Sequence, residues 1–370
     1  MLFEPVTSNK ESWNFSKILI DTPVKKGGKS VIGGEKMSVK IIDDSSLWDS
    51  FVDESPHGVL FHKWEFLKII EKYSGYTLLP FGIFEKKDKN LFCLFPLFYR
   101  KRLGMKMIFS QPPMSGIPFI GLLMNPHNSD IKQRQKESYM NTAVNEINSE
   151  IEALNPNYVS ISLGPYVQDI RPFIWNGFDS SIDYTYVIDL NPSLDTIWNS
   201  FDKDCRREIR TTEKYKLLLK ATDDVKKFYA INEDRYHQQQ LKFPFFGSDY
   251  LKAIIAAFPN SIKLYYLYNE QDIINLVINY EYHKRMVFWK GWVSLDRSIH
   301  SNEFLTWEFI KQAKSQGLQT LEIQGADVKR LCLFKSKFNP GLEQSFTIHK
   351  QDFLGGLGER TYKILSKKRM

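Results

Sequence analysis

Two successive blocks of this chain show the same alternation of strand-sized apolar runs with longer amphipathic segments. Residues 38–180 predict two helices, a group of strands, a long helix and one more strand, in that order. Residues 181–350 predict a strand, a set of helices, three neighbouring strands, a helix and a further strand. Such an order favours mixed sheets covered by helices. The chain is therefore predicted to be a mixed α/β protein in which a similar unit occurs twice.

The segments that flank the two blocks have a different composition. Residues 1–37 carry two Gly-Gly pairs and no sustained hydrophobic period. This pattern predicts a flexible leader, and a terminal arm packed on the body is the alternative. Residues 351–370 end in the basic, helical sequence 363–369, which predicts a basic C-terminal tail.

Composition excludes several classes of protein. Hydrophobic residues make up 42% of the chain, which excludes wholesale disorder. No apolar run reaches the roughly 18–20 residues that span a bilayer, and the N-terminus lacks the pattern of a signal peptide. The cysteines, Cys93, Cys205 and Cys332, are odd in number and far apart, so no disulfide framework is predicted. We therefore expect a cytoplasmic protein.

Common cofactor motifs are missing from the sequence. It has no Gly-x-Gly-x-x-Gly, no Gly-x-Ser-x-Gly, no His-Glu-x-x-His and no Cys-x-x-Cys, and its seven histidines are scattered. A protein-built catalytic metal site is therefore not expected. The net charge of +7 is mild for 370 residues and indicates an anionic ligand or surface without requiring nucleic acid.

The sharpest local feature is a basic helical segment at residues 203–214. Arg206, Arg207 and Arg210 lie in it, and Lys203, Arg207, Arg210 and Lys214 recur at spacings of four, three and four, which places these four on one helix face. Arginine forks on one face can bind a phosphate or pyrophosphate. The alternative is a solvated face that the acidic residues between them neutralise.

A second feature is a strand–loop–helix joint at residues 289–310. The strand contains Trp289, and the helix begins near Ser301 and Asn302, where free backbone N–H groups favour an anion. An ordinary joint between two elements is the alternative. Glu308 follows among apolar residues, so partial burial of its carboxylate would raise its pKa and suit it as a base. It could equally satisfy nearby hydrogen bonds.

A third feature combines a Gly-Ala-Asp turn with a lysine between aromatic residues. Gly325 follows a predicted strand and permits close approach of the backbone to a ligand, and Asp327 is a second candidate base. Lys335 follows Phe334. It is either a surface lysine or a group that stabilises negative charge in a site.

Taken in this order, the segments resemble the Fem-like (FemAB-type) branch of the GNAT acyltransferase superfamily. The resemblance covers about residues 39–350. The residues that carry it are Ser55-Pro-His-Gly58 to Trp64, Leu94-Phe-Pro-Leu97, Asp169–Phe178, Tyr184–Leu190, Arg206-Arg207-x-x-Arg210, Asn302-x-x-Leu305-x-Trp307-Glu308, Gln324-Gly-Ala-Asp327 and Phe334-Lys335-x-x-Phe338.

The resemblance implies two tandem GNAT-like domains, at 38–180 and 181–350, with the second one catalytic. It also implies an acyltransferase, because the family includes enzymes that transfer amino acids from aminoacyl-tRNA to peptidoglycan precursors. Other relatives are linked to cell-envelope polysaccharides and use acyl-CoA. The chain has no inserted helical hairpin arm and no GNAT pyrophosphate motif before Asn302.

From the residues and the resemblance together, we expect an N-acyltransferase that moves an acyl group from acyl-CoA to an amine or hydroxyl of an anionic acceptor. A nucleotide- or lipid-linked amino sugar is such an acceptor. The alternatives are a transferase that uses charged tRNA and a non-enzymatic RNA-binding or anion-binding module. The tail could also contact a membrane surface.

The expected roles follow the three features. The expected catalytic residues are Lys335, Glu308 and Asp327. The expected substrate contacts are Arg206, Arg207, Arg210, Asn302, Trp289 and Phe334. The expected acyl-CoA contacts are Ser301, Asn302 and Gly325, and no metal is expected.

Overall fold

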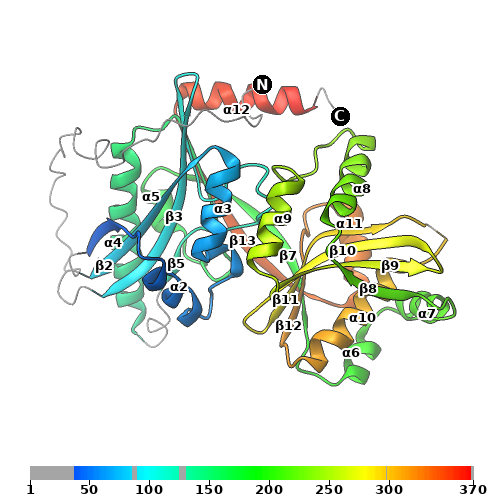
Figure 1. Ribbon diagram of the computed structural model, residues 1–370. Helices are drawn as coiled ribbons and strands as arrows, with labels where there is room; N and C mark the ends of the chain where they lie inside the picture. The colour runs from blue at the N-terminus through cyan, green and yellow to red at the C-terminus, as the bar shows by residue number, and fades with distance from the viewer. Residues whose placement is uncertain (1–36, 86–89, 125–130, 297, 368–370) are drawn as a thin grey trace. The chain divides into compact units, whose positions relative to one another are not determined.

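The computed structural model describes residues 37–85, 90–124, 131–296 and 298–367, and these form two compact units (Figure 1). Unit 1 contains the residues up to Ser181 and those from Phe346 onward, and unit 2 spans Ile182–Ser345. The first boundary lies beside the predicted one at 180/181. The C-terminal division differs, because residues 346–351 pair with a strand of unit 1 instead of ending the second domain. The predicted leader lies outside the described residues, apart from Met37.

Unit 1 consists of a sheet with helices between its strands. Its elements, in chain order, are β1 (Met37–Ile41), α2 (Ser45–Glu54), η1 (Leu60–His62), α3 (Trp64–Ser74), β2 (Thr77–Glu85), β3 (Leu91–Arg102), β4 (Met105–Phe109), β5 (Leu123–Met124), α4 (Gln133–Ala153), β6 (Tyr158–Leu163), α5 (Arg171–Trp175), the second half of β13 (Gly341–Gln351) and α12 (Phe353–Lys367). The strand order is β1-β2-β3-β4-β6-β13, with β4 and β6 parallel and the other neighbours antiparallel.

Unit 2 is built in the same way. Its elements are β7 (Asp179–Asp189), α6 (Leu194–Ser200), α7 (Lys203–Thr212), β8 (Leu218–Thr222), α8 (Val225–Gln238), α9 (Ser248–Ala257), β9 (Ile262–Asn269), β10 (Asp272–Tyr282), β11 (Arg285–Ser294), α10 (Ser301–Ser315), β12 (Thr320–Ile323), α11 (Lys329–Lys335), η3 (Ser336–Phe338) and the first half of β13. The strand order is β7-β12-β11-β10-β9-β8, and β11 and β12 are its parallel pair.

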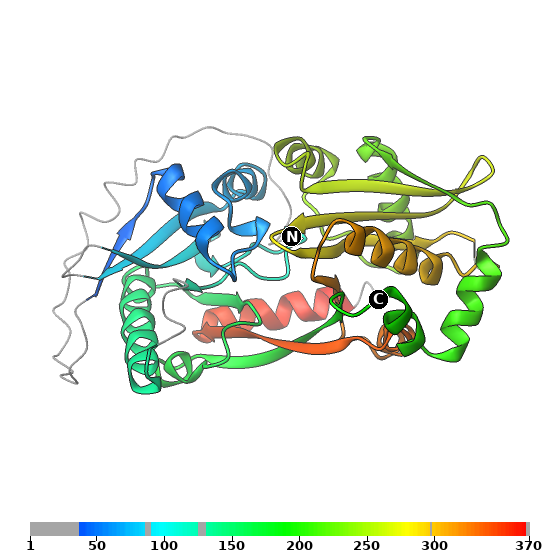
Figure 2. The same ribbon diagram turned by 90° about the horizontal axis from the view of Figure 1, so that it is seen from below.

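The two units therefore share one connection pattern, as the repeated order of predicted elements indicates. In each unit, antiparallel strands lead to a helix that returns the chain to a strand parallel to the last one. In unit 2 that helix is α10, which packs on one face of the sheet while α8 and α9 lie on the other (Figure 2). The central strands carry continuous runs of buried apolar residues, such as 276–278 and 286–289, so both faces of this sheet are covered by helices.

The core of unit 2 gathers α6, α7 and α10 against the sheet through side chains such as Ile209, Phe288 and Phe309. Among the described residues, no helix is both long and apolar enough to cross a membrane.

Candidate active site

The parallel ladder of unit 2 ends before its strands do. Strand β11 pairs with β12 only from Arg285 to Phe288, opposite Thr320 to Ile323. Beyond that point β11 continues to Ser294, whereas the chain after Ile323 leaves the sheet. The described residues place no strand beside the second half of β11 on this edge. We call this region, residues 289–293 and 324–327, the ladder end.

Two bulges shape β11 at the ladder end. The pairing with β10 skips Trp289 and then Trp292, so that Lys290 and Gly291 lie between two irregular positions. Gly291 has φ +91°, and a Cβ there would lie 2.8 Å from the carbonyl oxygen of Leu276. Only glycine adopts that conformation without strain at so close a backbone contact.

Lys335 reaches the ladder end from the last turn of α11. The residue is 4% exposed, and its Nζ donates hydrogen bonds to the carbonyl oxygen of Gln324 and, at 2.6 Å, to that of Gly325. Gly325 has φ +82°, a left-handed conformation that favours glycine. The structure thus brings together Lys335 and Gly325, as the sequence analysis proposed for a site. Phe334 lies half-buried beside this lysine with its ring 5.8 Å from that of Phe338.

Burial dominates the electrostatics of Lys335. The pKa of its ammonium is lowered to about 8, mainly by desolvation and also by the charge of Lys290, against the opposing effect of Cys332, Asp327 and Glu322. The pKa of Lys290 is also lowered to about 8 by burial. Two amines that change charge near neutral pH are therefore found at one ladder end.

The two carboxylates expected to act as bases have other partners. Asp327 is exposed, and its Oδ1 accepts a hydrogen bond from the backbone N–H of Tyr184 at 3.0 Å. Glu308 is partly buried, and its Oε1 accepts from Nζ of Lys311 at 2.6 Å. Both groups are thus placed in structural contacts.

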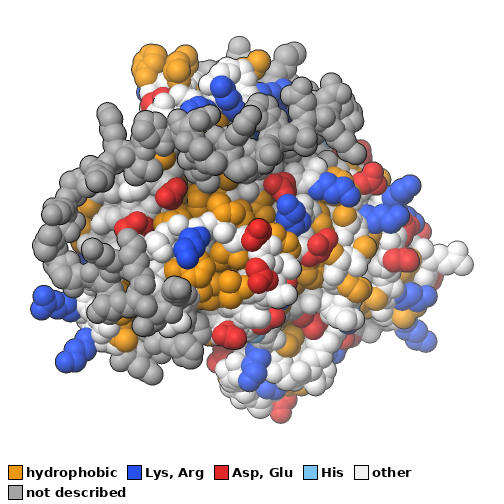
Figure 3. Space-filling model, turned by 60° about the vertical axis from the view of Figure 1, so that its left-hand side comes forward, with side chains coloured by type: hydrophobic (Ala, Val, Ile, Leu, Met, Phe, Trp, Pro, Cys, Tyr) orange, Lys and Arg blue, Asp and Glu red, His pale blue; other side chains and the backbone are white. Residues whose placement is uncertain are grey.

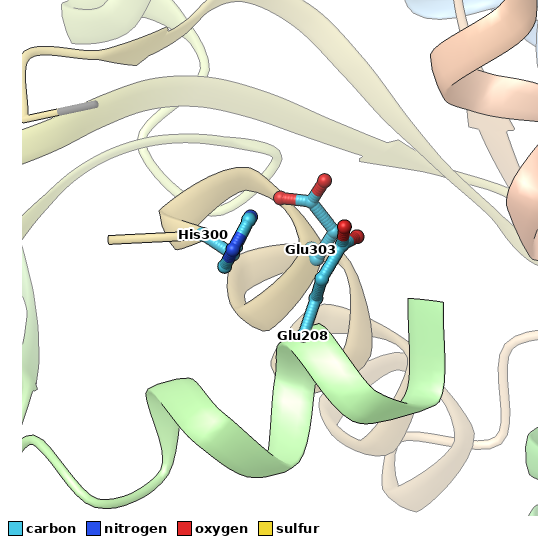
Figure 4. Close-up of side chains that lie close together, drawn as sticks. All are labelled: Glu208, His300 and Glu303. Atoms are coloured by element: carbon cyan, nitrogen blue, oxygen red, sulfur yellow. The ribbon is translucent and has the colours of Figure 1, made fainter. Parts of the chain in front are cut away.

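The start of α10 holds a carboxylate that sequence reasoning missed. Glu303 is 6% exposed, and burial raises its pKa although its own backbone N–H and the charge of Lys337 act in the opposite direction. Ligand atoms of Glu208, His300 and Glu303 lie within 4.8 Å of one another (Figure 4). Such a set could hold a divalent cation. However, Lys337 already supplies a positive charge, with Nζ 2.9 Å from Glu208 and 3.6 Å from Glu303.

Asn275 organises the other side chains at the start of α10. Its Nδ2 donates to Oγ of Ser301 at 2.8 Å and to Oδ1 of Asn302 at 2.7 Å. Ser301 and Asn302, two of the three residues expected to contact acyl-CoA, are therefore held by the protein itself. The backbone N–H of Ser301 also bonds internally, to the carbonyl oxygen of Ile299 at 2.8 Å.

The arginines of α7 divide between two environments. Arg206 is partly buried and donates to the carbonyl oxygens of Asn199 and Phe201, at 2.9 and 2.5 Å, at the end of α6. This arginine caps a helix, because the carbonyls at a helix end lack intrahelical partners. Arg207 and Arg210 are exposed. Arg210 lies 5.5 Å over the ring of Trp198, so it contacts the same helix, α6, as Arg206 does. Of the three arginines expected to bind substrate, Arg207 and Arg210 are therefore accessible, whereas Arg206 is held by carbonyl oxygens of the protein.

Trp289 occupies a core position. It is 2% exposed, and its ring lies 5.3 Å from that of Phe245 and 6.3 Å from that of Tyr280. This buried position differs from the accessible one expected of a substrate contact, because the ring of Trp289 packs into an aromatic cluster with Phe245 and Tyr280.

Comparisons with known proteins agree with this architecture. Residues 199–329 match the family model of the acetyltransferase (GNAT) domain. Among solved structures, FemX superposes with a TM-score of 0.61 at 13% identity, over 84% of this chain and 96% of that chain. The C-terminal domain of a putative lysylphosphatidylglycerol synthetase from Agrobacterium fabrum gives 0.52 at 11% identity, over 87% and 96%.

A tandem GNAT protein from the clavulanic acid biosynthesis pathway gives a TM-score of 0.50 at 9% identity, over 85% of this chain and 98% of that chain. No curated protein sequence matches significantly. The chain thus contains a GNAT acetyltransferase domain and has a tandem GNAT-like fold. Within that class it has the architecture of the Fem-like branch, as the motifs indicated.

Proposed function

We propose that unit 2 catalyses acyl transfer at the ladder end, with Lys335 as the group that stabilises negative charge. The observation that carries this proposal is the buried ammonium held by the carbonyl oxygens of Gln324 and Gly325. When a nucleophile attacks an acyl carbon, negative charge develops on the carbonyl oxygen. A fixed positive charge away from water stabilises that oxyanion far more than a solvated one. The GNAT match supports the same type of chemistry.

The acceptor in this proposal is an amine or hydroxyl of an anionic molecule, such as a nucleotide-linked or lipid-linked amino sugar of the cell envelope. The support is the pair of exposed arginines on α7 together with the net charge of +7. Arg207 is restrained only by Asp204, one turn away at 2.8 Å, and Arg210 lies 5.5 Å over the ring of Trp198. Both guanidinium groups remain open to a phosphate.

The backbone N–H groups at the start of α10 indicate which acyl donor the site can bind. A helix N-terminus attracts the pyrophosphate of a cofactor because its N–H groups are unsatisfied. Here Ser301 and Glu303 use their N–H groups internally, and the Glu303 carboxylate adds negative charge. An aminoacyl ester on tRNA has no such pyrophosphate next to its acyl group, so it suits this helix start better than acyl-CoA does. We therefore propose charged tRNA as the donor, and hence a cytoplasmic site of action.

A parallel assay of both donors tests this proposal. Purified protein is incubated with labelled acetyl-CoA, labelled longer acyl-CoAs or tRNA charged with labelled amino acids, and with a panel of nucleotide-linked and lipid-linked amino sugars. We expect transfer of label from charged tRNA only. Transfer from an acyl-CoA would overturn the donor assignment but keep the reaction. Salt-sensitive binding of any RNA, with no transfer from any donor, would favour the non-enzymatic binding module.

We also propose that the C-terminal region contacts a membrane surface that carries lipid-linked acceptor. Phe353 is 86% exposed on α12, and Leu103 is 84% exposed at the neighbouring β3–β4 turn. The two elements pack closely, because a Cβ at Gly358 would lie 2.6 Å from Met105. Hydrophobic side chains with cationic ones beside them are visible at this edge of unit 1 (Figure 3). Exposed apolar residues beside basic ones favour an anionic lipid surface.

Vesicle sedimentation tests this contact. Wild type should sediment with vesicles that contain anionic lipid and less with neutral ones, and Phe353→Ser should reduce the bound fraction severalfold. Equal sedimentation of variant and wild type would remove the assignment.

A further inference from the structure

Lys290 is a lysine for which the proposed mechanism has no role. It lies on β11 between the two bulges, opposite Ile278 and beyond the last residue that pairs with β12. It is only partly exposed, and within the described part of the chain its ammonium has no carboxylate partner. Its neighbours along the strand are Trp289 and Gly291.

An ammonium in such a place is costly to the folded protein. Removal from water disfavours the charged form, and no opposite charge compensates it. A strand position that only required packing would be better filled by an apolar residue. A partly buried, uncompensated amine beside a second one is typical of a functional site.

The proposed reaction needs a group that takes a proton, and the carboxylates around the ladder end are occupied. Asp327 accepts from the backbone N–H of Tyr184, and Glu308 accepts from Lys311. Glu322 accepts from Thr185 at 2.8 Å and from Arg285 at 3.0 Å.

Resting on the proposed function, we propose that Lys290 is the general base and acid of the acyl transfer. The amine nitrogen of the acceptor attacks the acyl carbon, a C–N bond forms, and the carbonyl oxygen becomes the oxyanion beside the Lys335 ammonium. The nitrogen releases its proton to the neutral Nζ of Lys290. When the tetrahedral intermediate collapses, the bond between the acyl carbon and the carrier oxygen breaks. Lys290 returns the proton to that oxygen and is neutral again.

The environments of the two lysines decide which one is neutral. The Lys335 ammonium donates to two carbonyl oxygens, which favours its charged form. Among the described residues, Lys290 has no such acceptors, and two like charges at one site make loss of one proton easier. The groups that act on Lys335 from the surrounding elements are Lys290, Cys332, Asp327 and Glu322. Because the two carbonyl oxygens hold the protons of Lys335, the first proton leaves from Lys290.

Two substitutions of Lys290 distinguish a role as general base from a purely electrostatic role of its positive charge. Lys290→Gln removes both the charge and the base, and Lys290→Arg keeps the charge but cannot act as a base near neutral pH. We expect both variants to lose about 10²–10⁴-fold in kcat, with the KM for the donor nearly unchanged. The limb of the wild-type pH–rate profile that rises towards pH 8 should disappear in both. Lys284→Gln, an exposed lysine of the β10–β11 turn, is the matched control and should behave as wild type.

The outcomes distinguish this inference from the proposed function. A wild type without transfer from any donor would remove the proposed function itself. An active wild type with an equally active Lys290→Arg variant would show an electrostatic role and overturn the base assignment. Wild-type protein alone gives a second readout, since labelling of Lys290 by an amine-reactive reagent should have its midpoint near pH 8. A midpoint near the ordinary lysine value of about 10.4 would also overturn it.

Discussion

The ladder end and the start of α10 both hold buried charged groups within unit 2, but these groups differ in sign and in their partners. At the ladder end, Lys335 is surrounded by carbonyl oxygens and shares its surroundings with a second lysine, Lys290. At the start of α10, Glu303 lies beside Glu208 and His300, and Lys337 pairs with both carboxylates.

The two regions differ in whether a neighbouring side chain of opposite charge compensates the buried one. In the α10 cluster a single lysine, Lys337, lies within 3.6 Å of both carboxylates, so the protein itself compensates part of their negative charge. The ladder end carries an excess of positive charge that a transient oxyanion would neutralise. We infer that the first region is structural and the second one is reactive, and four predictions test this contrast.

The largest effect is expected from Lys335→Met. Loss of the stabilising charge should lower kcat by about 10²–10³-fold. Below pH 8 the same change should stabilise the fold, because the wild type keeps a buried ammonium whose pKa is lowered to about 8. Wild-type stability rises with pH from about 8 to the unfolded lysine pKa near 10.4, so the advantage of the variant should shrink over that interval.

Steady-state kinetics and thermal unfolding at several pH values check this pair of effects. Lys329→Met changes an exposed lysine at the other end of α11 and serves as the control. Unchanged turnover in Lys335→Met would contradict the inference that the two regions differ, since the ladder end would then have only a structural role as well.

The next effect concerns the backbone of the ladder end. Gly291→Ala places a Cβ against the carbonyl oxygen of Leu276 at positive φ, and should cost about 2–3 kcal/mol of unfolding free energy. Gly317 has φ +75° but open space around its Cβ position. Gly317→Ala should therefore cost only about 1 kcal/mol. Denaturant titration of both variants measures the two losses of unfolding free energy. Equal losses would mean that the contact between a Cβ at position 291 and the carbonyl oxygen of Leu276 is unimportant.

A smaller effect separates the arginines that border the α10 cluster. Arg206→Ala leaves carbonyl oxygens at the end of α6 without a donor, and should cost about 1–2 kcal/mol. Arg207→Ala should change stability by less than about 0.5 kcal/mol, because its pair with Asp204 is exposed, and should weaken binding of a nucleotide-linked acceptor. A titration with nucleotide-linked amino sugars measures the second effect. The opposite pattern would reverse the roles assigned to them.

The smallest effect is expected from Glu303→Gln. Burial raises the pKa of this carboxyl, so its ionisation opposes folding, and the wild type loses stability as pH rises past the usual glutamate range. The variant does not titrate and should be more stable at pH 8 by about 1 kcal/mol, with little difference at pH 4. Melting temperatures at the two pH values check this. A variant that is less stable at both would show that its pair with Lys337 dominates.

Much of the architecture could be predicted from the sequence. The order of apolar runs gave the tandem α/β plan, since periodicity is a local property of the chain. Gly325 and Lys335 were both singled out in the sequence, and the structure places them in contact. The roles of Arg206 and Trp289 could not be predicted in this way. A residue's spacing on a helix or strand does not show whether a carbonyl or an aromatic cluster lies opposite it.

Lys290 and Glu303 differ in how clearly the sequence marks them as unusual residues. A lysine inside the apolar strand 286–293 is unusual by itself, and it could have been noticed. Glu303 in the first turn of a helix looked like an ordinary favourable residue, because acidic groups are common there. Its burial depends on α7 and η3, which pack over it through Glu208 and Lys337.

The sequence by itself determined the element order, the repeated unit and the family resemblance, because these follow from local periodicity and short motifs. Only the tertiary structure decided which charges are satisfied and which remain available. Asp327 meets Tyr184 across 143 positions of sequence, and Lys337 meets Glu208 across 129. Charge and burial are set by neighbours in space, so the surroundings of Lys335 could be described only from the folded structure.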